Sequence, residues 1–282
     1  AGEFLNLLQR TDALLHVVRT FQDPSVSHVE GWVDPYRDLA AIDLELAFAD
    51  LAILERRVER LEGEIKGAKA SERDAKLREH ATLDRLKGEL EHQVPIREQQ
   101  LSAEEGKLLE SFQFLTAKPI LIVWNTGEED LTQSSELEAK LKLQYSRPGM
   151  EVVVLCGKLE MDLAEMEDEE AEEFRSDMEL QESGLHRAIR TSYELLDLVS
   201  FFTVGSDEVR AWTIDRDIPA LKAAGKIHTD IERGFIRAEI ISYNHLIQCG
   251  GLAEGKKKGL LRLEGKTYKV QDGDVINFLF NV

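Results

Sequence analysis

The chain has 282 residues, with 54 acidic and 35 basic side chains and a formal net charge of −19 at pH 7. This length allows about two domains and a sizeable core. No apolar run reaches the roughly 18 residues of a membrane span, and we expect no signal peptide, because the first residues lack a basic start and an apolar stretch. Two cysteines, Cys156 and Cys249, argue against a disulfide framework. We therefore expect a protein of a reducing compartment, the cytoplasm.

The negative charge is unevenly spread along the chain. Residues 159–174 contain nine acids and no base, whereas residues 199–282 contain eleven acids and twelve bases. The acidic run lacks the spacing of a calcium loop, and the seven histidines form no His-x-x-x-His pair, so we expect no metal ligands in this chain. The carboxyl-terminal third is therefore slightly basic, and the net charge of the whole chain does not exclude an RNA partner for it.

Residues 1–35 begin with the pattern of an amphipathic helix followed by a strand. Four of the five residues at 4–8 are large and apolar, and residues 13–18 form an apolar run of strand length. A buried strand this early in the chain needs neighbouring strands to pair with. We therefore expect further strands to be encoded before Ala1.

Residues 36–112 predict a long helical hairpin. Apolar residues recur at alternating spacings of three and four, at Leu44, Ala47, Leu51, Leu54, Val58, Leu61 and Ile65, and again at Leu83, Leu86 and Leu90. The balanced charges between them are typical of a solvated coiled-coil surface. An antiparallel hairpin within one chain is the simplest arrangement. The alternative is a coiled coil that serves only dimerisation.

Residues 120–124 and 151–156 predict two buried parallel strands. The first should be the central strand of its sheet, and it is followed by Asn125, Thr126 and Glu128. In an open α/β sheet, ligands bind outside the carboxyl ends of the strands, so we expect these polar residues to face a binding crevice. A capped turn without a ligand is the alternative.

A helix over residues 185–198 is predicted to close this domain. We expect one face of it to carry the apolar contacts, formed by Ile189, Tyr193, Leu196 and Val199.

From residue 200 the pattern changes to short strands, predicted at 201–205, 209–214, 236–241, 260–270 and 275–282. Residues 250–257 have the Gly-x4-Gly-Lys spacing of a phosphate-binding loop. They end in lysine where Ser or Thr must hold Mg²⁺, and no apolar strand leads into them. We expect a solvated loop there.

Three stretches of the sequence resemble the YchF/Obg-like ATPase family. Residues 11–19 and 34–38 resemble the segment that follows the second switch in that family. Asn125 and Glu128 form an Asn-x-x-Glu where P-loop GTPases have Asn-Lys-x-Asp. Residues 225–239 closely resemble the signature of the family's carboxyl-terminal TGS domain, a β-grasp fold. His228 within that signature is either a catalytic base or, more simply, a capping or packing histidine.

The resemblance implies a fold with three parts. An α/β P-loop NTPase-type parallel sheet is expected at residues 1–35 and 113–198, with the phosphate-binding loop upstream of this chain. A helical coiled-coil insertion is expected at residues 36–112, and a TGS β-grasp domain at residues 199–282.

The resemblance also implies ATP binding and slow, Mg²⁺-dependent hydrolysis, with GTP bound more weakly and the ribosome contacted through the TGS domain and the hairpin. Glu128 favours adenine, because the longer acid spoils the clamp that an aspartate makes on guanine. The residues expected to bind the base are Asn125, Thr126, Glu128, Cys156, Gly157 and Lys158. Catalytic groups are expected upstream, and we expect a monomer. The alternative function is a non-enzymatic adaptor that binds ribosomal or protein partners.

Overall fold

The computed structural model describes residues 2–178, 180, 182–205 and 208–281. The chain divides into two compact units, a first unit of residues 1–195 and a second unit of residues 196–282. Among the described residues, no helix is both long and apolar enough to cross a membrane.

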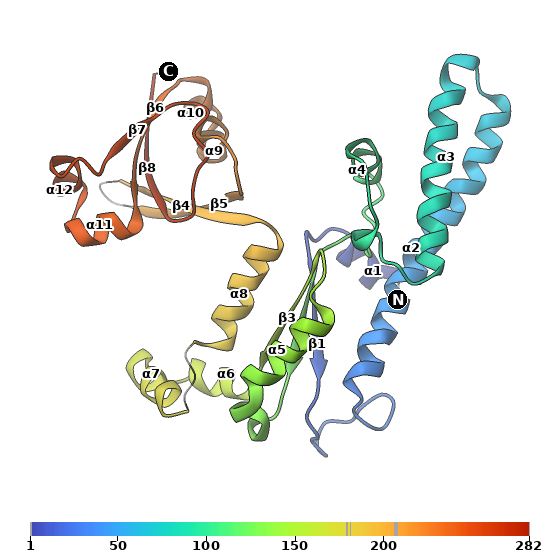
Figure 1. Cartoon of the computed structure of the whole chain (residues 1–282), viewed down its shortest axis with the longest axis horizontal. Coiled ribbons are helices and arrows are strands. Elements are labelled where there is room, and N and C mark those ends of the chain that lie inside the picture. Colours follow the sequence, from blue (N-terminus) through green and yellow to red (C-terminus); the bar gives the residue numbers. More distant parts are fainter. Residues whose placement is uncertain (1, 179, 181, 206–207, 282) are drawn as a thin grey trace. The chain divides into compact units, whose positions relative to one another are not determined.

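The first unit is built on a three-stranded parallel sheet of order β1-β2-β3 (Figure 1). Its strands are β1 (Leu14–Arg19), β2 (Ile120–Asn125) and β3 (Met150–Leu155). The predicted central position of β2 is confirmed, and its residues 120–124 are all at most 4% exposed. An apolar run without alternation is buried on both faces, as expected for a central parallel strand.

The two faces of the sheet are covered by different helices. Helix α2 (Pro35–Gly67) packs Leu39 and Leu46 against one face. Helix α8 (Gly184–Leu195) packs Ala188 against the other. The remaining elements of this unit are α1 (Gly2–Leu8), α3 (Ala70–Glu91), the short 3₁₀ helix η1 (Ile96–Glu98), α4 (Ala103–Leu109), the 3₁₀ helix η2 (Glu128–Gln133), α5 (Ser134–Tyr145), α6 (Gly157–Ala164) and α7 (Asp168–Asp177).

The apolar face predicted for α8 is wrong. Ile189 is 48% exposed, and Val199 lies beyond the helix in the next strand. The helix instead buries its small residues Gly184, Ala188 and Thr191. Small side chains let the helix backbone approach the sheet closely, which places larger residues on the outer side.

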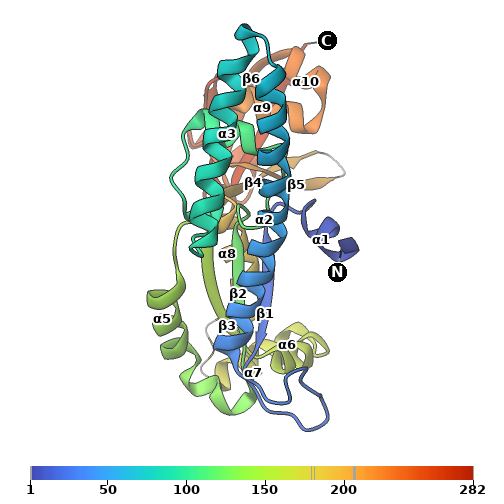
Figure 2. The same cartoon turned by 90° about the vertical axis from the view of Figure 1, so that its right-hand side faces the viewer.

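Helix α2 continues past the sheet and pairs with α3 in an antiparallel hairpin (Figure 2). Asp34 caps α2 by accepting from the N–H of Arg37, and Pro35 starts the helix without an N–H to satisfy. The hairpin core contains most of the predicted seam, namely Ala47, Leu51, Leu54, Val58, Leu61, Ile65, Leu83, Leu86 and Leu90. Leu44 departs from the prediction, since it is 41% exposed.

The two edges of the sheet differ. At the β3 edge, the N–H of Val154 donates to Glu138 at 2.9 Å, and its carbonyl accepts from Arg187 at 2.5 Å. Glu138 and Arg187 also form a salt bridge of 2.6 Å with each other. The backbone N–H and carbonyl of Val154 at this sheet edge are therefore both hydrogen-bonded to side chains. At the β1 edge, Leu15 and Val17 are 57% and 54% exposed.

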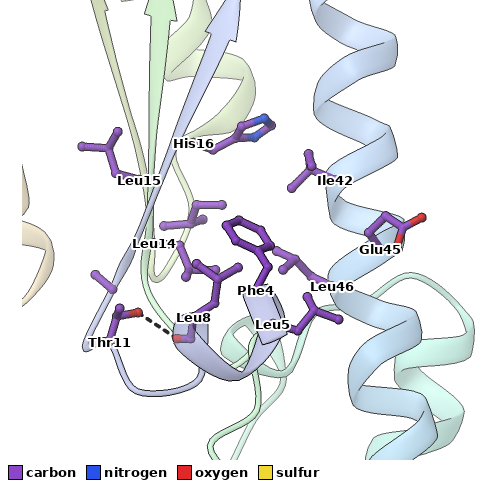
Figure 3. Close-up of a pocket in the computed structure, with 12 residues that line it drawn as sticks. Phe4, Leu5, Leu8, Thr11, Leu14, Leu15, His16, Ile42, Glu45 and Leu46 are labelled. Atoms are coloured by element: carbon purple, nitrogen blue, oxygen red, sulfur yellow. Dashed lines mark hydrogen bonds between the residues drawn. The ribbon is translucent and has the colours of Figure 1, made fainter. Parts of the chain in front are cut away.

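A cavity of about 410 Å³ lies beside β1, between α1 and α2 (Figure 3). Phe4 and Leu8 of α1 and Leu46 of α2 point into it. His16 also lines it, and burial lowers the pKa of this imidazole, whose Nδ1 has no hydrogen-bond partner among the described residues. The histidine is therefore held neutral in a mainly apolar space.

The second unit is a five-stranded mixed sheet of order β5-β4-β8-β6-β7. Strands β4 and β8 are parallel, and the other neighbouring pairs are antiparallel. Residues Ala220, Ala223 and Ala224 of helix α9 are fully buried in the core of this unit. The bounds are β4 (Leu198–Val204), β5 (Val209–Asp215), α9 (Ala220–Ile227), α10 (Thr229–Arg233), β6 (Phe235–Ser242), α11 (Tyr243–Cys249), α12 (Leu252–Lys257), β7 (Arg262–Glu264) and β8 (Asp274–Phe280).

Two local predictions in this unit are wrong. Most of the predicted loop at 250–257 is helical. Gly250 ends α11 with a left-handed φ of 78°, and residues 252–257 form the next helix, α12. Gly255 in α12 contacts Ile241, and a Cβ there would lie 2.6 Å from the isoleucine Cδ1. Of the strand predicted at 260–270, only the three residues of β7 (Arg262–Glu264) are in a strand, and these three residues pair with β6.

The residues of the 225–239 signature have structural roles in this fold. Nδ1 of His228 accepts from the N–H of Asp230 at 3.1 Å and caps α10, so the capping interpretation of this histidine is confirmed. Gly234 lies against the last strand, where a Cβ would be 2.2 Å from the carbonyl oxygen of Asn281. The signature therefore specifies a tight helix–strand junction.

Candidate functional site

Three polar groups meet at the carboxyl end of the parallel sheet. Thr20, directly after β1, donates its N–H and its hydroxyl to the carbonyl of Asn125, both at 3.0 Å. The side-chain Oδ1 of Asn125 accepts from the N–H of Gly157 at 2.8 Å. Asn125 is thereby held by the residue after β1 and by the first residue of α6, and its amide NH₂ group donates to no described residue.

Gly157 allows this contact because it has no side chain. A Cβ at this position would lie 3.1 Å from Oδ1 of Asn125, tighter than nine in ten such contacts in proteins. Gly157 also starts α6, so the hydrogen bond joins the end of β2 to the first turn of the helix after β3.

A second pair lies on the exposed rim of the same region. Glu128, at the start of η2, binds Lys158, in the first turn of α6, at 2.7 Å. Their side chains are 51% and 68% exposed, and the carboxylate of Glu128 raises the pKa of Lys158. The ion pair is accessible to solvent, so a ligand can compete for either partner.

The other two predicted residues turn their side chains inward. Thr126 and Cys156 are each 2% exposed, and Cys156 packs with Leu159 and Leu163. The N–H of Thr126 donates to the carbonyl of Leu155 at 2.9 Å. Of the six residues expected to bind a base, the structure brings Asn125 to Gly157 and Glu128 to Lys158, and it leaves Thr126 and Cys156 with backbone roles.

Thr20 and Arg19 were not anticipated. The guanidinium of Arg19 donates to the carbonyls of Phe21, Asp23 and Val26, which shapes the loop after β1. Their position in the sequence could have indicated them. They are the first polar residues after an apolar run, and that run ends at the same end of the sheet as Asn125.

The residues at this site do not fit Mg²⁺. Glu128 is already paired with Lys158, and the oxygen of Asn125 is taken by an N–H. Among the described residues, no three His, Cys, Asp or Glu side chains group closely enough to hold a metal. These residues therefore do not form a set of ligands for Mg²⁺.

A parallel α/β sheet whose polar residues converge beyond the carboxyl ends of its strands is the architecture of a nucleotide-binding α/β protein. The family model YchF-GTPase_C, described as a protein of unknown function (DUF933), matches residues 198–281. The ribosome-binding ATPase YchF of Bacillus subtilis (strain 168) is 44% identical over 283 residues, covering 100% of this chain and 76% of that protein. The Obg-like ATPase 1 of Caenorhabditis elegans is 40% identical over 281 residues, covering 99% of this chain and 70% of that protein. This chain belongs to the YchF family.

Solved structures agree with this assignment. The YchF GTPase of Schizosaccharomyces pombe superposes with a TM-score of 0.85 at 33% identity, covering 99% of this chain and 75% of that chain. A GTP-binding protein from Pyrococcus horikoshii OT3 gives a TM-score of 0.57 at 18% identity, covering 99% of this chain and 81% of that chain, a likeness of fold alone.

Proposed function

We propose that this protein binds and hydrolyses ATP in association with the ribosome, and that Asn125 and Glu128 select adenine over guanine. The observation that carries the proposal is the hydrogen bond from Gly157 to Oδ1 of Asn125. It orients the asparagine amide at the carboxyl end of the central strand, where α/β proteins bind nucleotides. The names of the relatives from Bacillus subtilis and Caenorhabditis elegans support the ATPase activity.

Base selection follows from donors and acceptors. Guanine presents donors at N1 and N2, whereas adenine presents an acceptor at N1 and donors only at N6. The NH₂ group of Asn125 can donate to N7 of either purine, so it binds without choosing between them. The carboxylate of Glu128 accepts only, and its extra methylene relative to aspartate places it to accept from N6 of adenine. Lys158 holds this carboxylate on the rim, and its stem can cover the base.

The proposal assigns no catalytic residue to these 282 residues. Phosphoryl transfer depends on a phosphate-binding loop with its lysine, on Mg²⁺ and on backbone amides. The Gly-x4-Gly-Lys match at residues 250–257 lies in the second unit, where residues 252–257 form α12. This chain therefore supplies base selection, and we propose that the phosphate-binding loop acts from outside it.

We further propose that the second unit, the TGS domain, contacts ribosomal RNA. Residues 199–282 of this unit carry a charge of +1, from twelve bases and eleven acids, in contrast with −20 for residues 1–198. Arg233 is 82% exposed, and neither Lys256 nor Lys258 forms an ion pair with a described residue. The hairpin is the second candidate surface for the same partner.

Calorimetric titration of ATP and GTP into the full-length gene product tests the base site. We expect ATP to bind several-fold more tightly than GTP, and we expect Glu128→Asp to shift the ratio toward GTP by about 1–3 kcal/mol. Glu129→Asp is the matched control, because it shortens an exposed neighbouring acid. P-loop GTPases carry a lysine at the position of Thr126. The test does not introduce it, because the side chain of Thr126 is buried.

Equal affinities for ATP and GTP in the parent protein would rule out base selection by Glu128. Ribosome binding without any measurable nucleotide binding would favour the non-enzymatic adaptor.

A further inference from the structure

A second cavity, of about 350 Å³, lies at the root of the helical hairpin within the first unit. It is enclosed by the first half of α2, by the segment that follows α3 and by Met150 at the start of β3. Met150 begins the strand, whereas the candidate base site follows its carboxyl end. A six-residue strand spans about 20 Å, so this cavity is separate from that site.

Arg97 lines this cavity and is almost completely buried. Its side chain is 3% exposed and packs against Gly149, where a Cβ would lie 3.4 Å from the arginine Cβ. Nη1 donates to the carbonyl of Thr116 at 3.3 Å, but Nε has no partner among the described residues. Nη2 lies 3.8 Å from Oδ1 of Asp43, beyond hydrogen-bond distance. The Nε and Nη2 edge of this guanidinium therefore makes no hydrogen bond to a described residue.

Two carboxylates that line the same cavity also have oxygens without a hydrogen bond. Oδ1 of Asp43 and Oε1 of Glu98 are both buried without a hydrogen-bond partner among the described residues. The other oxygen of Glu98 lies 3.3 Å from Arg147, which is 50% exposed at the mouth. Burial raises the pKa of Asp43, as expected for an acid that lacks donors. With Glu91, which also lines it, the cavity holds three acids and two arginines, a formal net charge of −1.

These open groups define the ligand by their chemistry. Buried polar atoms without partners cost free energy, so a ligand that satisfies them gains affinity. The Nε and Nη2 edge of an arginine matches a carboxylate with two parallel hydrogen bonds. An ammonium group carries three donors and no acceptor, which suits the oxygens of Asp43 and Glu98. A cluster that contains both acids and arginines favours a ligand that carries both charges close together.

The apolar lining of the cavity supplies the remaining contact. Leu44 and Phe48 on α2 are 41% and 63% exposed, although one of them was expected in the hairpin seam. We propose that this cavity binds a free α-amino acid with an apolar side chain. Its carboxylate binds Arg97, its ammonium group binds Asp43 and Glu98, and its side chain covers Leu44 and Phe48.

This site joins the hairpin to the sheet. Asp43 belongs to α2, Arg97 follows α3, and Met150 belongs to β3. An amino acid bound there would bridge all three elements, so its binding would hold the hairpin root against the sheet.

NMR of the protein labelled with ¹³C at its methionine methyl groups tests the proposal. Met150 is 4% exposed and lines the cavity, whereas Met161, Met166 and Met178 lie in or beside α6 and α7 and serve as internal controls. Titration with L-leucine is expected to shift the Met150 signal alone, with half-saturation at about 1 mM for so small a ligand. Isovalerate, isoamylamine and N-acetyl-L-leucinamide each lack one or both charges and are expected to leave it unchanged in that range.

Asp43→Asn tests the ammonium contact, because it removes the charge of this side chain and keeps its shape. We expect it to weaken L-leucine binding by at least about tenfold, while Asp84→Asn on the exposed surface of α3 leaves binding unchanged. The proposal is overturned if L-leucine fails to shift Met150. It is also overturned if N-acetyl-L-leucinamide shifts Met150 equally, or if Asp43→Asn binds as tightly as the parent.

Discussion

Asp50 accepts two hydrogen bonds from Thr116, one from the backbone N–H and one from the hydroxyl, both at 2.7 Å. The N–H of Leu115 donates to the other carboxylate oxygen at 2.9 Å. Asp50 is 0% exposed and lies in α2, while Thr116 lies in the segment that enters β2. One buried carboxylate therefore ties the hairpin helix to the central strand of the sheet.

Replacing Asp50 by Ala is expected to lower the free energy of unfolding by about 3–5 kcal/mol, because three buried donors lose their acceptor. Urea denaturation followed by circular dichroism measures this change. Asp84→Ala, at an exposed position of α3, is the control and should stay within about 0.5 kcal/mol of the parent. A loss for Asp50→Ala no larger than that of the control would contradict this role.

Glu105 gives a pH-dependent contribution. Its carboxylate accepts from the N–H of Ser102 in a capping box and binds Arg85, and these partners lower its pKa from 4.5 to about 2. Since the folded pKa is depressed, the stabilisation is complete above pH 4.5 and is lost as the pH falls toward 2.

The difference in unfolding free energy between the parent and Glu105→Gln should therefore become smaller as the pH falls from 4.5 to about 2. A difference that stayed constant from pH 6 to about pH 2 would show that the charge of Glu105 is not involved.

Leu54 tests whether the hairpin is an intramolecular unit. It is 0% exposed and packs among leucines of α3, so Leu54→Ala should cost about 2–5 kcal/mol of stability without changing the molecular mass in solution. Leu77→Ala is the control, because Leu77 on α3 is 45% exposed. Light scattering that showed a dimer falling to a monomer would instead place the seam between two chains.

The proposed RNA surface predicts a change in salt dependence. Replacing Lys256 and Lys258 by Gln should weaken co-sedimentation with ribosomes and flatten its salt dependence by about one unit of slope for each lost phosphate contact. Lys222→Gln is the control within the same unit, since Lys222 is already paired with Glu232 at 2.7 Å. If removal of residues 199–282 leaves binding unchanged, the contact belongs to the hairpin.

The sequence by itself determined the elements that carry strong local signals. Continuous apolar runs predicted β2 and β3, because a strand buried on both faces has no polar alternation. The spacing of three and four predicted the hairpin seam from Ala47 to Leu90, because residues at that spacing share one face of a helix. The placement of Asn125 at a strand end followed from the same local reasoning.

Other features were decided only by contacts between distant parts of the chain. Asp50 and Thr116 are 66 residues apart, and Asn125 and Gly157 are 32 apart, so no local window contains either pair. Contacts with neighbouring elements of the fold also decide three local features. These are the exposure of Ile189, the helix at 252–257 and the short length of β7. Local patterns set what each segment can form, but burial and hydrogen bonding across the fold choose which side chains are covered. For this reason Thr126 and Cys156 became core residues while Glu128 and Lys158 remained accessible.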